Sequence, residues 1–356
     1  MKQFDQVHEP EPREVPRRPR PALLSRIALG AYPLGGGYGA VGEPQARATV
    51  DAALEAGWTF FDTAETYLES EERLGRILRG RRDRVFLATK AFPSEAYTSA
   101  NLRASLEASL RRLGTDRVDL LQLHGPEDWV RPFGPTPLEE VGEALEELRV
   151  SGKAVHVGVC NLPAADMDAL SASVELFSTQ NLYNMIDRGD EPDGLHLPVE
   201  TEIIPFARER GIAFFAYSPL SRGLLADGLD PDRTFGTDDE RHFLPRYRRG
   251  VYEQYVELAG QLSAWAHERG RTLEQLAVAW TLNRPGVTAS IVGAKSPEQV
   301  QAMSEADEWR LEEAELAELD GVLATLPRGA REAKMVVWEH FQEDALERLR
   351  MRRHGR

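Results

Sequence analysis

The chain has 356 residues, 42% of them hydrophobic, and its acidic side chains outnumber the basic ones by 58 to 43. This length suits one α/β barrel with insertions, and the net charge of −15 disfavours a nucleic-acid partner, which would need a basic face. The single cysteine, Cys160, excludes an internal disulfide and a thiolate metal cluster. Because the sequence shows neither an apolar run of about 18 residues nor an N-terminal signal segment, we expect a cytoplasmic protein without a membrane partner.

The N-terminal segment 1–26 is biased in composition, since its five prolines alternate with arginines. Proline lacks an amide donor and favours extended geometry, so we expect a disordered or loosely draped arm. At the other end, residues 325–356 follow the last predicted unit and finish on a basic, helix-prone stretch. We expect a C-terminal helical tail there.

Between these ends, short apolar runs alternate with amphipathic stretches. The predicted strands are 27–31, 58–62, 85–90, 118–123, 154–158, 175–180, 212–217 and 288–292. The periodicity of helices appears at 43–57, 102–113, 138–150, 272–282 and 297–306. Eight βα units without a break in composition favour a closed (β/α)8 TIM barrel over residues 27–324, rather than a doubly wound open sheet.

Three connections bear on this choice and on the site. The glycine run 35–39 lacks the G-x-G-x-x-G spacing of an open dinucleotide-binding sheet, so we expect a flexible loop there. The connections 181–198 and 218–250 are longer than a bare barrel needs. Since βα loops lie on the catalytic face of a barrel, both are predicted to border the site.

Polar side chains stand at the ends of three consecutive predicted strands. Asp62 ends the second strand, Lys90 ends the third, and His124 follows the fourth, while Tyr67 comes five residues after Asp62. Neighbouring barrel strands place their carboxyl ends side by side, so the four side chains are expected to meet at one mouth. Each residue alone is more often a cap, a solvated charge or a structural group; the combination indicates catalysis.

These four side chains suit the reduction of a carbonyl group by hydride. Negative charge then develops on the carbonyl oxygen, which calls for an acid and for hydrogen-bond donors. We expect Tyr67 to be the acid, with its ordinary pKa of about 10 lowered by the ammonium of Lys90, which Asp62 would hold in place. A neutral His124 would donate a hydrogen bond to the oxygen.

Several motifs resemble the signature of the aldo-keto reductase superfamily over about residues 29–306. They are 60–67 (FFDTAETY), 87–90 (LATK), 121–124 (LQLH), 154–161 (AVHVGVCN), Gln180 and 217–224 (YSPLSRGL). The resemblance implies an NADP(H)-dependent carbonyl or alcohol oxidoreductase with Tyr67 as general acid.

The resemblance also implies a set of cofactor-binding residues. Asn161 and Gln180 would hold the nicotinamide carboxamide, and Tyr217 would stack on the nicotinamide ring. The pyrophosphate would be wrapped by Ser218, Leu220, Ser221, Gly223 and Leu224. The adenosine phosphate would meet Gly293, Lys295, Ser296 and Gln299, and the set is completed by Gly30 and Tyr32.

Four positions depart from the pattern of the superfamily. Cys160 replaces a serine, Gln299 an arginine, Met303 an asparagine, and Leu68 a glycine. The changes at the adenosine end leave NAD(H) open as the cofactor, although the cation that Lys295 offers to a 2′-phosphate favours NADP(H).

Aromatic residues in the predicted loops are candidates for the substrate wall: Tyr32, Phe92, Tyr97, Trp129 and Phe133. Tyr32 and Trp129 are the expected contacts for a small carbonyl substrate, which could be an aldehyde, a ketone or a keto-sugar. The sequence has no cluster of arginines that would indicate a strongly anionic substrate.

Two other functions are open. The chain could be an NADP-binding regulatory subunit with little turnover, as in the potassium-channel β-subunit branch that it resembles. It could also be a metal-dependent barrel isomerase or hydrolase, although its eight histidines are scattered. The sequence does not indicate an oligomeric state.

Overall fold

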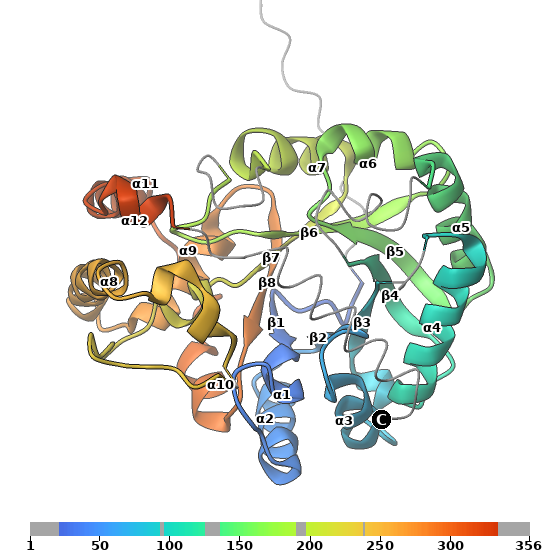
Figure 1. Cartoon of the computed structure of the whole chain (residues 1–356), viewed down its shortest axis with the longest axis horizontal. Coiled ribbons are helices and arrows are strands. Elements are labelled where there is room, and N and C mark those ends of the chain that lie inside the picture. Colours follow the sequence, from blue (N-terminus) through green and yellow to red (C-terminus); the bar gives the residue numbers. More distant parts are fainter. Residues whose placement is uncertain (1–20, 93–95, 125–135, 190–196, 238, 334–356) are drawn as a thin grey trace, which may run out of the picture.

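The strands of the protein form a central ring with the helices around it (Figure 1). The structure is a computed structural model that describes residues 21–92, 96–124, 136–189, 197–237 and 239–333. All eight strands are parallel and pair in chain order, and β1 closes the ring by pairing with β8. The predicted TIM barrel is therefore confirmed.

The eight strands lie within two residues of their predicted bounds at both ends. They are β1 (Ile27–Gly30), β2 (Phe60–Asp62), β3 (Phe86–Ala91), β4 (Val118–Leu123), β5 (Ala154–Cys160), β6 (Leu176–Leu182), β7 (Ala213–Tyr217) and β8 (Val287–Gly293). The pairing register places Lys90 opposite Gln122 and Cys160 opposite Gln180, all close to the carboxyl end of the ring.

The five predicted helices are present as α2 (Glu43–Glu55), α4 (Ser99–Leu113), α5 (Leu138–Val150), α9 (Leu273–Asn283) and α10 (Pro297–Met303). Their ends follow local chemistry: Thr272 and Gln275 form a capping box before α9, and Gly114 ends α4 in the left-handed region. The remaining helices are α1 (Tyr32–Gly35), α3 (Ser70–Ile77), α6 (Ala164–Leu170), α7 (Ile204–Arg210), α8 (Tyr252–His267), α11 (Glu313–Leu323) and α12 (Arg328–Arg331).

The glycine run 35–39 is more ordered than predicted. Residue 35 completes the helical turn α1, Gly36 follows with a φ of 105°, and Tyr38 forms an antiparallel bridge with Asp239. Part of the segment therefore has regular structure where we expected only a loop, because it pairs with the long connection after β7.

The core has two layers, one inside the ring and one between the ring and the helices. Leu23 and Leu24, from the segment that we assigned to the disordered arm, pack in the inner layer. Leu24 is only 4% exposed and packs with Phe60, Phe86 and Phe215, while the Ser25 hydroxyl accepts hydrogen bonds from the amides of residues 59 and 60. The ordered chain therefore begins before residue 27.

The remaining terminal predictions fall largely outside the described residues. This applies to residues 1–20 of the arm and to residues 334–356 of the tail. The described part of the tail contains the single turn α12, where Ala330 is buried. Within the described residues, no helix is long and apolar enough to cross a membrane.

Candidate active site

A cavity of about 390 Å³ opens at the carboxyl ends of the strands. Its wall combines the end of β2, the ends of β5 to β8 and the long connection 218–250. Asp62, Tyr67 and His124 line it, and Lys90 lies directly behind Tyr67. The structure thus brings together the four residues that the sequence grouped.

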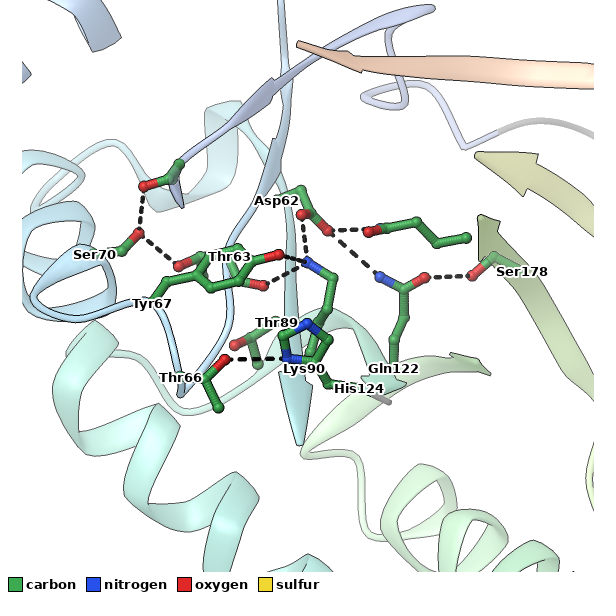
Figure 2. A network of polar contacts seen from close by, with 12 residues as sticks. Asp62, Thr63, Thr66, Tyr67, Ser70, Thr89, Lys90, Gln122, His124 and Ser178 are labelled. Atoms are coloured by element: carbon green, nitrogen blue, oxygen red, sulfur yellow. Dashed lines mark hydrogen bonds and ion pairs between the residues drawn. The ribbon is translucent and has the colours of Figure 1, made fainter. Parts of the chain in front are cut away.

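Lys90 is the centre of the cluster (Figure 2). Its Nζ lies 2.5 Å from Asp62 Oδ2, 3.1 Å from the Thr63 carbonyl oxygen and 3.2 Å from the Tyr67 hydroxyl. The side chain is 1% exposed, and an ammonium has three protons to donate. These three contacts therefore match its donor capacity and aim one donor at the phenol oxygen.

Asp62 is held on its other side by two amides. Gln180 donates to Asp62 Oδ1 over 2.9 Å and Gln122 over 3.4 Å, and Gln122 in turn accepts from Ser178. Both carboxylate oxygens are thus occupied, which fixes the direction in which Asp62 meets Lys90. Gln180 lines the cavity as expected, but it donates to Asp62 as well.

The pKa of Tyr67 differs from our expectation. Burial raises it to about 12, and the opposing attraction of the Lys90 ammonium is too small to reverse the shift. The prediction of a lowered pKa was wrong because it left out the loss of water around the phenol. For Lys90, burial lowers the pKa, but the nearby Asp62 and Tyr67 outweigh this effect and raise the pKa overall.

His124 is a neutral imidazole at neutral pH. Burial, and then the charge of Lys90, hold its pKa well below the usual 6.5. Its Nδ1 lies 3.1 Å from the Thr66 hydroxyl (Figure 2), and its ring stands edge-to-face with Tyr67 at 5.5 Å. With Thr66 donating to Nδ1, the proton of the neutral ring lies on Nε2.

Most of the residues expected to hold a cofactor line the same cavity. They are Gly30, Tyr32, Asn161, Gln180, Tyr217, Ser218, Leu220, Gly223, Gly293, Lys295 and Gln299. Three others do not line it. Leu224 packs in the core, the Ser221 hydroxyl bonds to Asp187, and Ser296 caps α10.

Asn161 presents an unused acceptor to this cavity. It follows β5 with a φ of 49°, and its buried Oδ1 makes no hydrogen bond with any residue that the structure describes. A buried acceptor without a partner is unfavourable. A ligand amide at this position would satisfy it.

The turn after β7 has an unusual backbone. Ser218, Ser221 and Arg222 have φ values of 57°, 46° and 56°, and Gly223 has a φ of 100°. Each non-glycine residue in this region costs roughly 1–2 kcal/mol. Gly223 adopts the conformation without a Cβ penalty, and it leaves the backbone exposed toward the cavity.

Cationic side chains gather at the far end of the cavity. Lys295 follows β8, and Arg233 and Arg241 come from the connection after β7. Burial, and then the charge of Arg241, lower the pKa of Lys295, with a further contribution from Arg233. The guanidinium groups of Arg233 and Arg241 both lie over the ring of Phe235, and Asp239 pairs with Arg241 at 2.6 Å.

Arg222 lines the cavity as well. None of these three arginines was predicted from the sequence, because Arg222, Arg233 and Arg241 are spaced irregularly within one loop. They could have been proposed because several arginines occur in a connection that was already predicted to border the site. The same connection reaches across to the start of the barrel. Tyr32 donates to Glu240 over 2.7 Å, and Glu240 also pairs with Arg222.

The substrate-wall predictions have mixed outcomes. Tyr32 lines the cavity, with its ring 5.0 Å from that of Tyr67. Phe92 and Tyr97 are buried in the protein instead of lining the cavity. Trp129 and Phe133 lie outside the described residues.

Cys160 also lines the cavity, and burial raises the pKa of its thiol to about 12. The thiol is therefore protonated at neutral pH, consistent with a packing role. Among the residues that the structure describes, no three histidine, cysteine or carboxylate side chains are grouped as a metal site would require.

Comparison with known proteins agrees with this geometry. The Aldo/keto reductase family profile matches residues 26–324. Aldo-keto reductase YhdN of Bacillus subtilis is 33% identical over 312 residues, covering 84% of this chain and 90% of that protein. Methylglyoxal reductase YeaE of Escherichia coli is 31% identical, covering 81% of this chain and 88% of that protein.

Solved structures share the fold. Glycerol dehydrogenase AKR11B4 from Gluconobacter oxydans matches with a TM-score of 0.74 and 29% identity, covering 88% of this chain and 95% of that chain. An aldo-keto reductase from Klebsiella pneumoniae in complex with NADPH matches with a TM-score of 0.67 and 31% identity, over the same shares. On the strength of the profile, the relatives and the barrel, the chain belongs to the aldo/keto reductase family.

Proposed function

We propose that this protein is an NADP(H)-dependent oxidoreductase that reduces the carbonyl group of a small aldehyde, ketone or keto-sugar to an alcohol. The observation that carries the proposal is the contact of one buried ammonium, Lys90, with both Asp62 and the cavity-lining phenol of Tyr67. This arrangement positions the Tyr67 hydroxyl as a proton donor for the carbonyl oxygen of the substrate, on which negative charge develops during reduction.

The cavity suits a nicotinamide dinucleotide. NADP(H), when bound, supplies the hydride. Asn161 offers an unsatisfied buried acceptor for the carboxamide, and the turn around Gly223 presents backbone to a pyrophosphate. A bound NADPH in the Klebsiella relative, and the name of aldo-keto reductase yakc [NADP(+)] of Schizosaccharomyces pombe, support the same cofactor.

The preference for NADP(H) over NAD(H) rests on the cations at the far end. Gln299 offers no charge there, but Lys295 together with Arg241 and Arg233 supplies positive charge from two loops. A 2′-phosphate would relieve the repulsion among these cations. The arginines therefore offset the loss of a cation at position 299.

Proton transfer is the role of Tyr67. Its hydroxyl gives its proton to the substrate oxygen as charge builds there, and the Lys90 ammonium stabilises the phenolate that forms. Asp62 keeps Lys90 aimed at the phenol, because its second oxygen is fixed by Gln180 and Gln122. After turnover, Tyr67 regains a proton from solvent.

His124 fixes the substrate oxygen. As a neutral donor through Nε2, it stabilises negative charge without competing for the proton of Tyr67. Tyr32 borders the same part of the cavity and packs against Tyr67. It is therefore our candidate for contact with both cofactor and substrate, while Trp129 remains a sequence-based candidate.

The test is Tyr67→Phe, assayed with NADPH and a panel of small carbonyl compounds. We expect kcat to fall by about 10² to 10⁴, the usual contribution of a general acid, with the Kd for NADPH unchanged. The control is Tyr183→Phe, because that buried hydroxyl bonds to Glu200 instead of lining the cavity. Near-normal turnover in Tyr67→Phe would sink the assignment, and tight NADPH binding by a wild type without turnover would favour the regulatory alternative.

A further inference from the structure

The strained turn Ser218–Leu224 depends on its surroundings. Ser218, Ser221 and Arg222 all occupy the left-handed region, which non-glycine residues rarely adopt. Such a conformation persists only where neighbouring groups over-determine it. The question is which side chains do so, since the turn lines the cavity.

Asn184 and Asp187, which follow β6, form hydrogen bonds with this turn. The Asn184 amide donates to the Ser218 carbonyl oxygen over 3.0 Å and to Asp187 Oδ2 over 2.8 Å. The Ser221 hydroxyl donates to the same Asp187 oxygen over 3.2 Å. Asp187 therefore connects to the turn at two points, directly at Ser221 in its middle and through Asn184 at Ser218, its first residue.

Arg246 completes the arrangement from the connection after β7. Its Nη1 lies 2.6 Å from Asp187 Oδ1 and 3.5 Å from the Ser221 hydroxyl, and its Nε donates to the Ala333 carbonyl oxygen over 2.8 Å. Asp187 and Arg246 are both 2% exposed. One guanidinium thus joins the turn, the β6 connection and the segment after α12.

A buried ion pair is a poor source of stability, because desolvation offsets most of its attraction. It does hold groups in a fixed geometry, since removing one partner leaves a buried charge. We propose that Asp187 and Arg246 are positioning residues that hold the turn Ser218–Leu224 ready for the cofactor pyrophosphate. This inference rests on the proposed function for its ligand, but the pre-ordering of the turn can be measured without any cofactor.

The first experiment compares Asp187→Asn and the double variant Asp187→Leu/Arg246→Met with the wild type. The double variant removes both charges, so it folds even where a lone buried arginine would prevent folding. Hydrogen–deuterium exchange of a peptide covering 218–224 is followed without cofactor. We expect its amides to exchange about tenfold faster in the double variant, because local opening becomes easier.

The second readout is NADPH binding by titration, beside the melting temperature. We expect the Kd for NADPH to rise about tenfold in both variants, with kcat at saturating NADPH near the wild-type value. The matched control is Glu200→Gln, which lies on the same connection but bonds to Tyr183 and Arg284.

The outcomes separate the two claims. Unchanged exchange at 218–224 in the double variant, or a double variant that binds NADPH as tightly as the wild type, would overturn the positioning role. A melting temperature lowered alone, with normal Kd and exchange, would show a merely structural pair and also overturn it. A wild type that fails to bind NADPH contradicts the proposed function, while the exchange measurement still decides the role of Asp187 and Arg246.

Discussion

Replacing Lys90 by methionine removes the group on which the catalytic cluster converges. Methionine keeps the length and apolar volume of the side chain but donates nothing. The variant loses the 2.5 Å contact with Asp62, the 3.1 Å contact with the Thr63 carbonyl and the 3.2 Å contact with the Tyr67 hydroxyl. Each of these contacts has a separate consequence.

The loss at Tyr67 determines the effect on rate. A hydrogen bond to a charged group contributes about 1.5–3 kcal/mol, which corresponds to roughly 10- to 150-fold in kcat. Attraction to Lys90 lowers the pKa of Tyr67, and Asp62 raises it, so the phenol of the variant becomes a weaker acid still. We therefore expect a kcat reduction at or above the upper end of this range, with the Kd for NADPH unchanged.

The loss at Asp62 determines the effect on stability. Removing one partner of a buried pair is destabilising by about 3–5 kcal/mol. The double variant Asp62→Asn/Lys90→Met has no orphaned charge, so we expect most of the stability to return while kcat stays low. Steady-state carbonyl reduction with saturating NADPH and thermal melting measure the two effects. A Lys90→Met enzyme with kcat within threefold of wild type, or one whose kcat recovers with stability in the double variant, would refute the reasoning.

Three further predictions concern pH, cofactor choice and cofactor release. Reduction needs a protonated Tyr67, whose pKa is about 12, and a neutral His124, whose pKa is well below 6.5. We therefore expect kcat for reduction to stay nearly constant from about pH 7 to 9. A bell-shaped pH profile of kcat inside that window would contradict this expectation. Lys295→Ala and Arg241→Ala should each weaken NADPH about tenfold in titrations and leave NADH unchanged, whereas equal losses for both cofactors would contradict a 2′-phosphate role. The Tyr32→Phe variant loses the hydrogen bond to Glu240, so we expect NADPH to dissociate about 2- to 12-fold faster in stopped-flow traces. An unchanged dissociation rate would show that this hydrogen bond does not help to retain the cofactor.

The barrel could be predicted from the sequence because its signals are local. Short apolar runs such as 118–123 and stop signals such as Gly114 depend only on neighbouring residues. The helices α3 and α6 were not predicted, because eight and seven residues show little of a helical period. The order in residues 35–39 comes from pairing with a segment some 200 residues later, which no local pattern reveals.

The catalytic cluster could be predicted for a reason of topology. Asp62, Lys90 and His124 end consecutive strands, and parallel strands of a barrel end side by side. The direction of the Tyr67 pKa shift could not be predicted from the sequence, because it depends on how completely the folded chain removes water from the phenol. Charge pairing is visible in a list of residue types, but desolvation is a property of the packed structure.

The residues that line the cofactor-binding part of the cavity could be predicted only in part. The glycine and asparagine positions of the motifs could be placed because backbone requirements leave a mark on residue type. The contribution of Arg241 could not, because the connection 218–250 has no repeat that predicts its path, and its course is set by tertiary contacts such as that of Tyr32 with Glu240. Departures such as Gln299 therefore cannot be judged from their own position, since a cation from another loop can replace the one that is missing.

Two buried ion pairs lie next to elements that border the same cavity, one pair on strands and the other in connections. Lys90 and Asp62 lie at the ends of β3 and β2, and Asp187 and Arg246 lie in the connections after β6 and β7. Because desolvation offsets most of the attraction in such pairs, apolar substitution of both partners is often neutral or stabilising. If each pair acts through geometry, both double substitutions should leave a well-folded barrel, one defective in proton transfer and the other in cofactor affinity. That outcome would show that the fold does not require these charges, and that their positions are explained by the site that they support.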